Sequence, residues 1–148
     1  MNRELSNAEK ARLVFLVSKR VDTYLDSGSG ECILARPSIA RMLVNTLLHF
    51  NGLRYKLYTW CVMPNHVHAI FRPLEKHKLA DIVHSWKSFS SKEANRLLNR
   101  SGTLWQREYY DHLLRDAEDF CGCIRYVINN PSKAGLKNWP WVDVSESS

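Results

Sequence analysis

Long hydrophobic runs are missing from this sequence of 148 residues. None approaches the roughly 20 consecutive apolar residues that a membrane-spanning helix needs, so no membrane association is expected. The polar start, residues 1–4, is unlike a secretory signal peptide, which favours a soluble, cytoplasmic protein. Internal repeats and low-complexity tracts are also lacking. The length and the hydrophobic content of 45% suit a single domain over residues 1–148 with a sizeable core, residues 142–148 forming a tail.

Cysteine is scarce, and the Cys-x-x-Cys pairs of a zinc ribbon are lacking. A cytosolic setting disfavours disulfides, so we expect reduced and mostly buried thiols. Cys121 and Cys123 are separated by one residue. Together with a histidine they leave a zinc-stabilised interaction module as a rival interpretation, although their spacing is wrong for the common zinc motifs. The cysteines number four: Cys32, Cys61, Cys121 and Cys123.

Acidic residues are outnumbered by basic ones, and the formal net charge of +6 favours a polyanionic partner. The excess is concentrated between Lys76 and Arg107, where seven basic residues accompany two acidic ones. Trp86, Phe89 and Trp105 are interleaved with them and could stack on unpaired bases while the cations follow phosphates. The alternative is a solvated helix face above core aromatics, and the helical spacing of Trp86 and Phe89 favours core packing.

Hydrophobic periodicity and turn residues predict both helices and strands, and therefore an α+β protein. Pro131 should end the last helix, because proline does not continue one. The segment Trp139-Pro140-Trp141 should cover the fold. Helices are predicted over about 7–25, 37–51, 78–99 and 117–129, and strands over 31–35, 55–63 and 67–71.

Two histidines separated by one apolar residue stand out directly after Pro64. Side chains alternate across a strand, so His66 and His68 should share one face while Val67 packs into the other. Two imidazoles side by side suit a divalent metal ion. Taken alone, such a pair is more often two half-exposed strand residues without a ligand.

The last predicted helix carries a second chemical group. Tyr126 and Asn130 are four residues apart and should project from one helical face. A tyrosine can attack a phosphodiester and preserve the bond energy as a covalent phosphotyrosine, provided that a metal ion polarises the phosphate. Asn130 could add an oxygen ligand to the histidine nitrogens, and such a mixed shell suits Mg²⁺ or Mn²⁺. The structural alternatives are a core tyrosine and a C-terminal helix cap.

These residues belong to four ordered blocks that resemble the REP-associated tyrosine transposases, a branch of the single-tyrosine HUH transposase family. The resemblance spans roughly residues 22–141. It implies a fold of the ferredoxin-like HUH nuclease type, in which helices flank a central antiparallel sheet that carries the His-x-His strand. The blocks are Arg54 to Phe71 with Met63-Pro64-Asn65-His66-Val67-His68, Ser85-Trp86-Lys87-Ser88-Phe89, Leu104-Trp105-Gln106-Arg107-Glu108-Tyr109-Tyr110-Asp111-His112 with Arg115-Asp116, and Tyr126-Val127-Ile128-Asn129-Asn130-Pro131 with Lys133-Ala134-Gly135-Leu136.

The resemblance implies a metal-dependent endonuclease and strand transferase that cleaves single-stranded DNA beside palindromic hairpin repeats. His66 and His68 would be metal ligands, Asn130 the third ligand, and Tyr126 the nucleophile. Cleavage would leave a 5′-phosphotyrosine on one fragment and a free 3′-hydroxyl on the other. We expect hairpin DNA as the partner, a monomer or homodimer, and a nucleoid-associated location in a bacterial-type cytoplasm.

Six basic residues are the candidates for DNA contacts. Tyr109 and Tyr110 are assigned to folding or DNA contact rather than to attack on the phosphate. His112 is assigned a structural or phosphate-facing role rather than metal binding. The six candidates are Lys87, Lys92, Arg96, Arg100, Arg107 and Arg115.

One departure from the family concerns the first residues. Members usually have an early strand with a Val-Thr-Phe-Arg-like sequence inside the sheet, whereas residues 1–21 are predicted here as an atypical N-terminal helix. The sheet would then lack its first strand and expose an edge beside the histidines. This leaves a catalytically inactive hairpin DNA-binding protein, derived from a transposase, as the alternative function.

Overall fold

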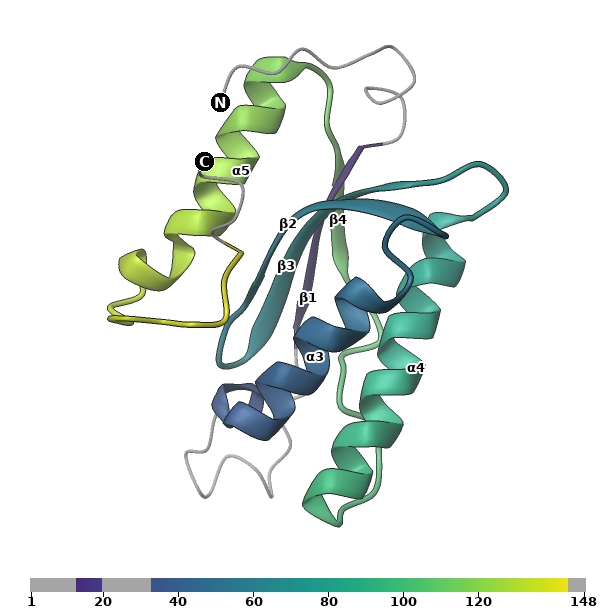
Figure 1. Cartoon of the computed structure of the whole chain (residues 1–148), viewed down its shortest axis with the longest axis vertical. Coiled ribbons are helices and arrows are strands. Elements are labelled where there is room, and N and C mark those ends of the chain that lie inside the picture. Colours follow the sequence, from purple (N-terminus) through teal and green to yellow (C-terminus); the bar gives the residue numbers. More distant parts are fainter. Residues whose placement is uncertain (1–12, 20–32, 144–148) are drawn as a thin grey trace.

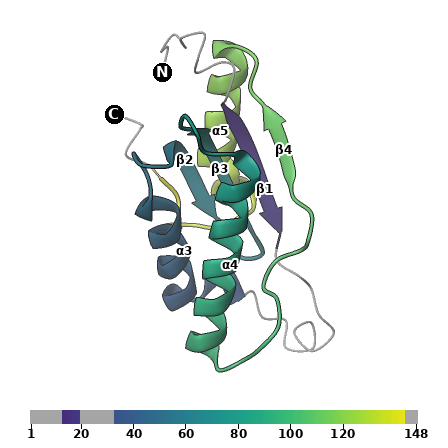
Figure 2. The same cartoon turned by 90° about the vertical axis from the view of Figure 1, so that its right-hand side faces the viewer.

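Three layers make up the computed structural model of the protein, which describes residues 13–19 and 33–143 (Figure 1). The middle layer is an antiparallel sheet with the strand order β2-β3-β1-β4. Helices α3 (Pro37–His49) and α4 (Leu79–Leu98) cover one face, and α5 (Ala117–Lys133) covers the other (Figure 2). This arrangement confirms the predicted α+β class. The strands are β1 (Val14–Lys19), β2 (Tyr55–Val62), β3 (His66–Pro73) and β4 (Tyr110–Leu113).

Strand β1 shows that the predicted helix over residues 7–25 is wrong for Val14–Lys19, while the rest of that range lies outside the described residues. β1 pairs with β3 on one side and β4 on the other, so the sheet has an N-terminal strand in an interior position. Leu16 packs into the core beneath α3 and α4, and Phe15 packs into the core beneath α5. A short apolar run is compatible with a helix or with a strand that is buried on both faces. Here the backbone pairing with β3 and β4 stabilises the strand.

Two further predicted elements differ from the structure. Ile33–Ala35 is a short 3₁₀ helix, η1, rather than part of a strand, while residues 31 and 32 lie outside the described residues. Its Ile33 and Leu34 are buried in the core that includes α3, and no strand pairs with it among the described residues. The sequence predicts no strand over residues 110–113, because this edge strand is short and largely exposed.

Helix α5 continues past Pro131, where the prediction ended it at about residue 129. Pro131 is buried and extends the stripe that Phe120, Ile124 and Val127 present to the sheet. Burial of this stripe outweighs the single hydrogen bond that the proline cannot donate. The helix ends at Lys133, followed by Gly135 with a φ of 81°.

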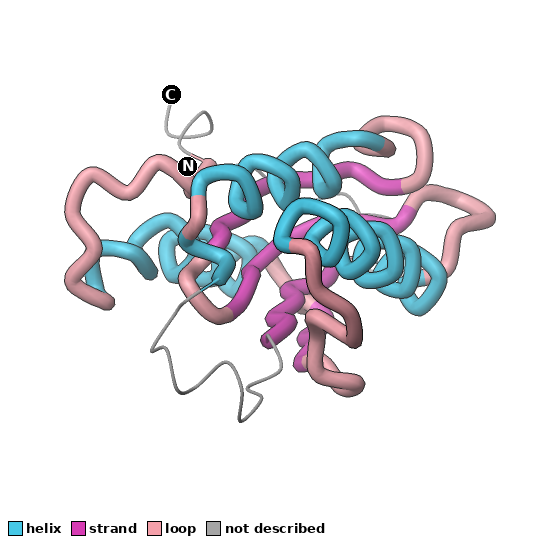
Figure 3. The backbone as a smooth tube through the Cα atoms, turned by 90° about the horizontal axis from the view of Figure 1, so that it is seen from below, coloured by secondary structure: helices cyan, strands magenta, loops and turns pink. Residues whose placement is uncertain are grey.

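The two cores account for most of the aromatic residues. Trp86 donates to the Tyr55 hydroxyl at 3.1 Å, and Trp105 donates to Ser90 Oγ at 2.8 Å. Both indoles are buried in the core beneath α3 and α4, which pack side by side (Figure 3), so base stacking by Trp86 and Trp105 is excluded in this conformation. Phe89 is 54% exposed, against the expected core packing.

Residues 139–143 cover the outer edge of β2, where the sequence predicted only that Trp139-Pro140-Trp141 covers the fold. Val62 N–H donates to the Trp141 carbonyl at 2.8 Å, and the Trp139 indole donates to the Val62 carbonyl at 2.8 Å. These bonds pair an edge that would otherwise present free backbone groups. Among the described helices, none combines the length and apolar character needed to cross a bilayer.

Candidate active site

His66 and His68 point to the same side of β3, as the alternation of the strand predicted. Their Nε2 atoms are 2.9 Å apart, whereas Val67 and Ala69 lie in the core on the opposite face. His68 is buried with 2% exposure, and His66, at the start of the strand, is half-buried. The histidine face is the one that α5 covers, because the rings of His68 and Tyr126 are in contact.

The surroundings keep both imidazoles neutral. Burial, followed by the proximity of His66, lowers the pKa of His68 to about 4, although a contact with the Asn130 side chain partly opposes this shift. Burial and the charge of Lys19 also lower the pKa of His66. The Asn65 Oδ1 atom lies 2.6 Å from His66 Nδ1, which favours a proton on Nδ1 and a lone pair on Nε2. Neutral imidazole is the form that binds metal ions.

The donor set fits a bound divalent cation. Two Nε2 atoms converge on one point, and the Asn130 side chain from α5 reaches the same histidine. Two imidazole nitrogens and one amide oxygen are compatible ligands for Mg²⁺ or Mn²⁺, among other divalent ions. The predicted trio of His66, His68 and Asn130 is therefore brought together by the fold, with two members from β3 and one from α5.

Tyr126 stands beside this trio. Its ring packs edge-on against His68, with ring centroids 5.5 Å apart, and 46% of the residue is exposed. Since Asn130 also contacts His68, the two residues share the helical face that their spacing predicted. Because nearly half of Tyr126 is exposed, it is accessible to a molecule that binds beside the buried His68.

Phe15 is a site residue that the sequence analysis missed. It stacks on His68 with an interplanar angle of 7° and meets Tyr126 edge-on, with centroid distances of 5.8 Å in both cases. Tyr110, which lies diagonally from Phe15 on the neighbouring strand β4, meets the same ring edge-on at a centroid distance of 6.2 Å. The apolar and aromatic run from Val14 to Val17, which suits a helix as well as a strand, is the signal in the sequence that points to this residue.

The six basic candidates do not gather around the histidines. Helix α4 carries three of them in the layer on the other side of the sheet, Lys87, Lys92 and Arg96, and Arg100 lies two residues beyond the end of the helix. Exposed Lys92 and Arg107 line one hollow of about 400 Å³, which includes part of α4 and the segment after it. Arg115, directly before the N-cap of α5, lies on the histidine side of the sheet and pairs with Asp119.

Two of the basic residues on α4, Lys87 and Arg96, are already engaged within the protein. Lys87 donates to the carbonyls of Gln106 and Arg107 at 2.8 and 3.4 Å, and burial lowers its pKa. Arg96 forms an ion pair with Glu93 on the same helix. Lys87 therefore fixes the segment that leads into β4.

The part of the chain that matches known proteins includes the histidine strand and the helix with Tyr126 and Asn130. A family model described as "Transposase IS200 like" matches residues 41–130. A Haemophilus influenzae protein, provisionally named a REP-associated tyrosine transposase, is 28% identical over 95 residues, covering 55% of this chain and 54% of that protein. A REP-associated tyrosine transposase of Escherichia coli K12 is 23% identical over 91 residues, covering 59% of this chain and 53% of its own. The chain thus spans about half the length of the curated relatives it matches.

A solved structure of a REP-associated tyrosine transposase bound to a REP hairpin has a similar fold. The TM-score is 0.71 at 18% sequence identity, and the alignment covers 99% of this chain and 84% of that one. At this identity the similarity concerns the fold. The antiparallel sheet with helices on both faces is therefore the architecture that the two proteins share.

Proposed function

Because the chain belongs to the IS200-like transposase family, we propose that it is a metal-dependent single-stranded DNA endonuclease and strand transferase that acts at palindromic hairpin repeats. The observation that carries the proposal is the convergence of His66 Nε2 and His68 Nε2 at 2.9 Å, with Tyr126 packed against His68. The proposal includes a single-domain protein, as a monomer or homodimer, in a bacterial-type cytoplasm at the nucleoid.

His66, His68 and Asn130 are the residues that would hold Mg²⁺ or Mn²⁺. When bound, the ion would polarise the scissile phosphate and offset charge in the transition state. The low pKa of His68 serves this role, because the imidazole stays neutral and available at physiological pH. Phe15 holds the His68 ring in place by parallel stacking.

Tyr126 is the proposed nucleophile. Its hydroxyl oxygen would form a bond to phosphorus and lose its proton, while the bond from phosphorus to the 3′-oxygen of the preceding nucleotide breaks and that oxygen takes up a proton. The products are a 5′-phosphotyrosine and a free 3′-hydroxyl. Attack of a 3′-hydroxyl on the phosphotyrosine reverses the same bond changes and rejoins strands.

The DNA partner is proposed from the charge distribution and from the relative that binds a REP hairpin. Lys92 and Arg107 are the best placed for phosphate contacts, because both are exposed and line one hollow. The alternative of an inactive hairpin binder rested on a sheet without its first strand. β1 removes that ground.

The test is covalent trapping on DNA. Labelled single-stranded hairpin oligonucleotides, taken from repeats flanking the protein's own gene, are incubated with Mg²⁺ or Mn²⁺ and resolved on denaturing gels. A covalent adduct is expected for the unaltered protein and for Y110F, and none for Y126F. Tyr110 is the matched control, since it is exposed and contacts the same Phe15 ring. Specific hairpin complexes on native gels without any adduct would instead identify a binder without chemistry.

A further inference from the structure

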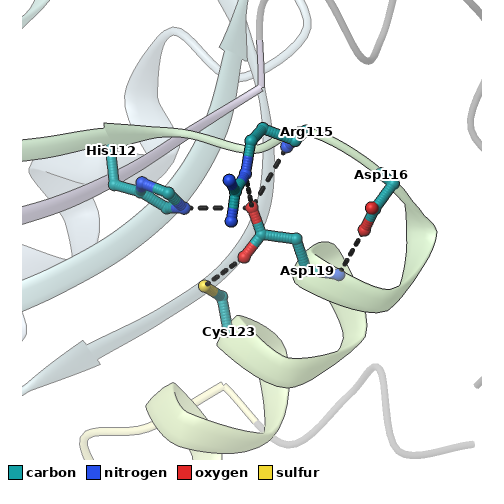
Figure 4. A network of polar contacts seen from close by, with 5 residues as sticks. All are labelled: His112, Arg115, Asp116, Asp119 and Cys123. Carbon is teal, nitrogen blue, oxygen red and sulfur yellow. Dashed lines mark hydrogen bonds and ion pairs between the residues drawn. The ribbon is translucent and has the colours of Figure 1, made fainter.

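A second cluster of metal-binding side chains lies between β4 and the first turns of α5 (Figure 4). His112 comes from the edge strand, and Asp119 and Cys123 come from successive turns of the helix. One ligand atom from each residue lies within 4.8 Å of the other two. His112 Nε2 is 3.0 Å from Asp119 Oδ2, and Cys123 Sγ is 4.0 Å from Asp119 Oδ1.

The cluster is held in place by its neighbours. Arg115 N–H donates to Asp119 Oδ2 at 3.1 Å, and the Asp119 N–H donates to Asp116 Oδ1 at 2.8 Å. Asp119 and Cys123 also line a hollow of about 440 Å³ that opens to solvent. The Arg115 guanidinium lies 3.7 Å from Asp119, but its side chain is 80% exposed and is free to turn toward solvent.

We propose that His112, Asp119 and Cys123 bind one Zn²⁺ ion, with water from the adjoining hollow as the fourth ligand. Imidazole nitrogen, carboxylate oxygen and thiolate sulfur are the three zinc donors used in proteins, and one atom of each lies within 4.8 Å of the other two here, close enough for side-chain rotation to bring all three onto one tetrahedral ion. The sulfur favours zinc over the hard cations Mg²⁺ and Mn²⁺. Binding needs the thiolate, so the Cys123 proton is released to solvent when the metal–sulfur bond forms.

The ion would join the edge strand β4 to the helix that carries Tyr126. β4 is a short edge strand that pairs only with β1 among the described strands, and α5 carries Tyr126 three residues after Cys123. A metal bridge from His112 to Cys123 fixes the edge strand against the first half of this helix. The proposal is independent of the strand-transfer function, because it concerns different side chains and its test uses no DNA.

Only one cysteine of the Cys121 and Cys123 pair that the sequence spacing suggested belongs to this cluster. Both cysteines lie on α5, and residues i and i+2 of a helix point in different directions, so they do not bind one metal ion together. The cluster contains Cys123 and not Cys121. Cys121 is therefore a matched control on the same helix, two residues away and also partly buried.

The experiment is a Co²⁺ titration of the full chain after removal of metals with a chelator. We expect one equivalent of Co²⁺ to produce a thiolate-to-cobalt charge-transfer band, and Zn²⁺ to displace it. The band should persist in C121S and vanish in C123S. Zn²⁺ should raise the melting temperature of the unaltered protein and of C121S by more than that of C123S, in which only the His66, His68 and Asn130 set remains.

A second variant guards against misfolding of C123S. H112N alters a partly exposed side chain on the other element and should weaken Co²⁺ binding by more than the roughly 10–100-fold typical of losing an outer hydrogen-bond partner. The absence of a thiolate–cobalt band in the unaltered protein would overturn the proposal. So would a band that survives C123S, or affinity that is unchanged in H112N.

Discussion

The ring of Phe15 lies parallel to the imidazole of His68, with the centroids 5.8 Å apart and the planes within 7°. The two residues come from neighbouring strands of the sheet, β1 and β3. Phe15 also meets Tyr126 edge-on, so one side chain of the interior strand contacts both the proposed ligand and the proposed nucleophile. Strand β1 is thus part of the site as well as of the core.

Removal of this ring should affect both stability and chemistry. Phe15 is 8% exposed, so we expect F15A to lower the free energy of unfolding by about 3–5 kcal/mol. The L113A variant, which trims a side chain with 53% exposure on β4, should stay within about 0.5 kcal/mol of the unaltered protein. Urea unfolding measures both. In the fraction that stays folded, F15A should also form less covalent adduct, and full adduct formation would separate Phe15 from the site.

Acid should destabilise the metal-free protein through His68. Its pKa is about 4 when folded and near its ordinary value of 6.5 when unfolded. Between these values the unfolded chain binds more protons, so stability falls as the pH drops from 6.5 to 4, by about 3 kcal/mol for this group. Above pH 6.5 the contribution is constant. Urea unfolding in chelator across this range measures the slope.

The matched variants for the pH dependence are H68N and H84Q. His84 is an exposed histidine on α4, away from the cluster of rings around His68. H84Q should keep the loss of stability on acidification, whereas H68N should reduce it and leave the smaller part due to His66. An equal slope in the unaltered protein and H68N would contradict the assignment.

The proposed role of Asn130 as a metal ligand can be tested against the neighbouring Asn129, which has no such role. N130A should raise the Mn²⁺ concentration needed for adduct formation by at least about tenfold, because it removes an oxygen donor beside His68. N129A, which changes an exposed residue of the same helix, should behave like the unaltered protein. Titration of Mn²⁺ against adduct yield gives both values. The same response in the two variants would point to a general effect on α5.

Phosphate contacts can be counted from the salt dependence of hairpin binding. If Lys92 contacts one phosphate of a single strand, K92A should flatten the slope of log affinity against log salt by about 0.7. K76A is the control. Lys76 is exposed in the turn that follows β3, at the opposite end of this strand from His66. Fluorescence anisotropy at several salt concentrations measures the slopes. An unchanged slope in K92A would assign Lys92 to the solvated helix face.

Local patterns predicted much of the candidate site. The alternation of a strand put His66 and His68 on one face, and the turn of a helix put Tyr126 and Asn130 on another. Both are short-range rules that need no knowledge of the rest of the fold. The contact between the two faces was not predictable from either segment, since it depends on α5 packing over β3.

The errors have a common origin in non-local pairing. Val14 to Lys19 formed a strand because β3 and β4 offered hydrogen bonds on both sides, and the same apolar run would suit a helix elsewhere. Pro131 stayed inside α5 because its ring is buried with the helix stripe. In both cases burial and pairing with distant residues outweighed local preference.

The sequence by itself determined which groups are available for chemistry and which neighbours share a face: the strand histidines, and the helical tyrosine with its asparagine. Only the tertiary structure decided that Phe15 stacks on His68 and that His112 meets Asp119 and Cys123. The reason is physical. Spacing along one element sets directions within that element, whereas contacts between elements depend on register and on which surfaces bury each other.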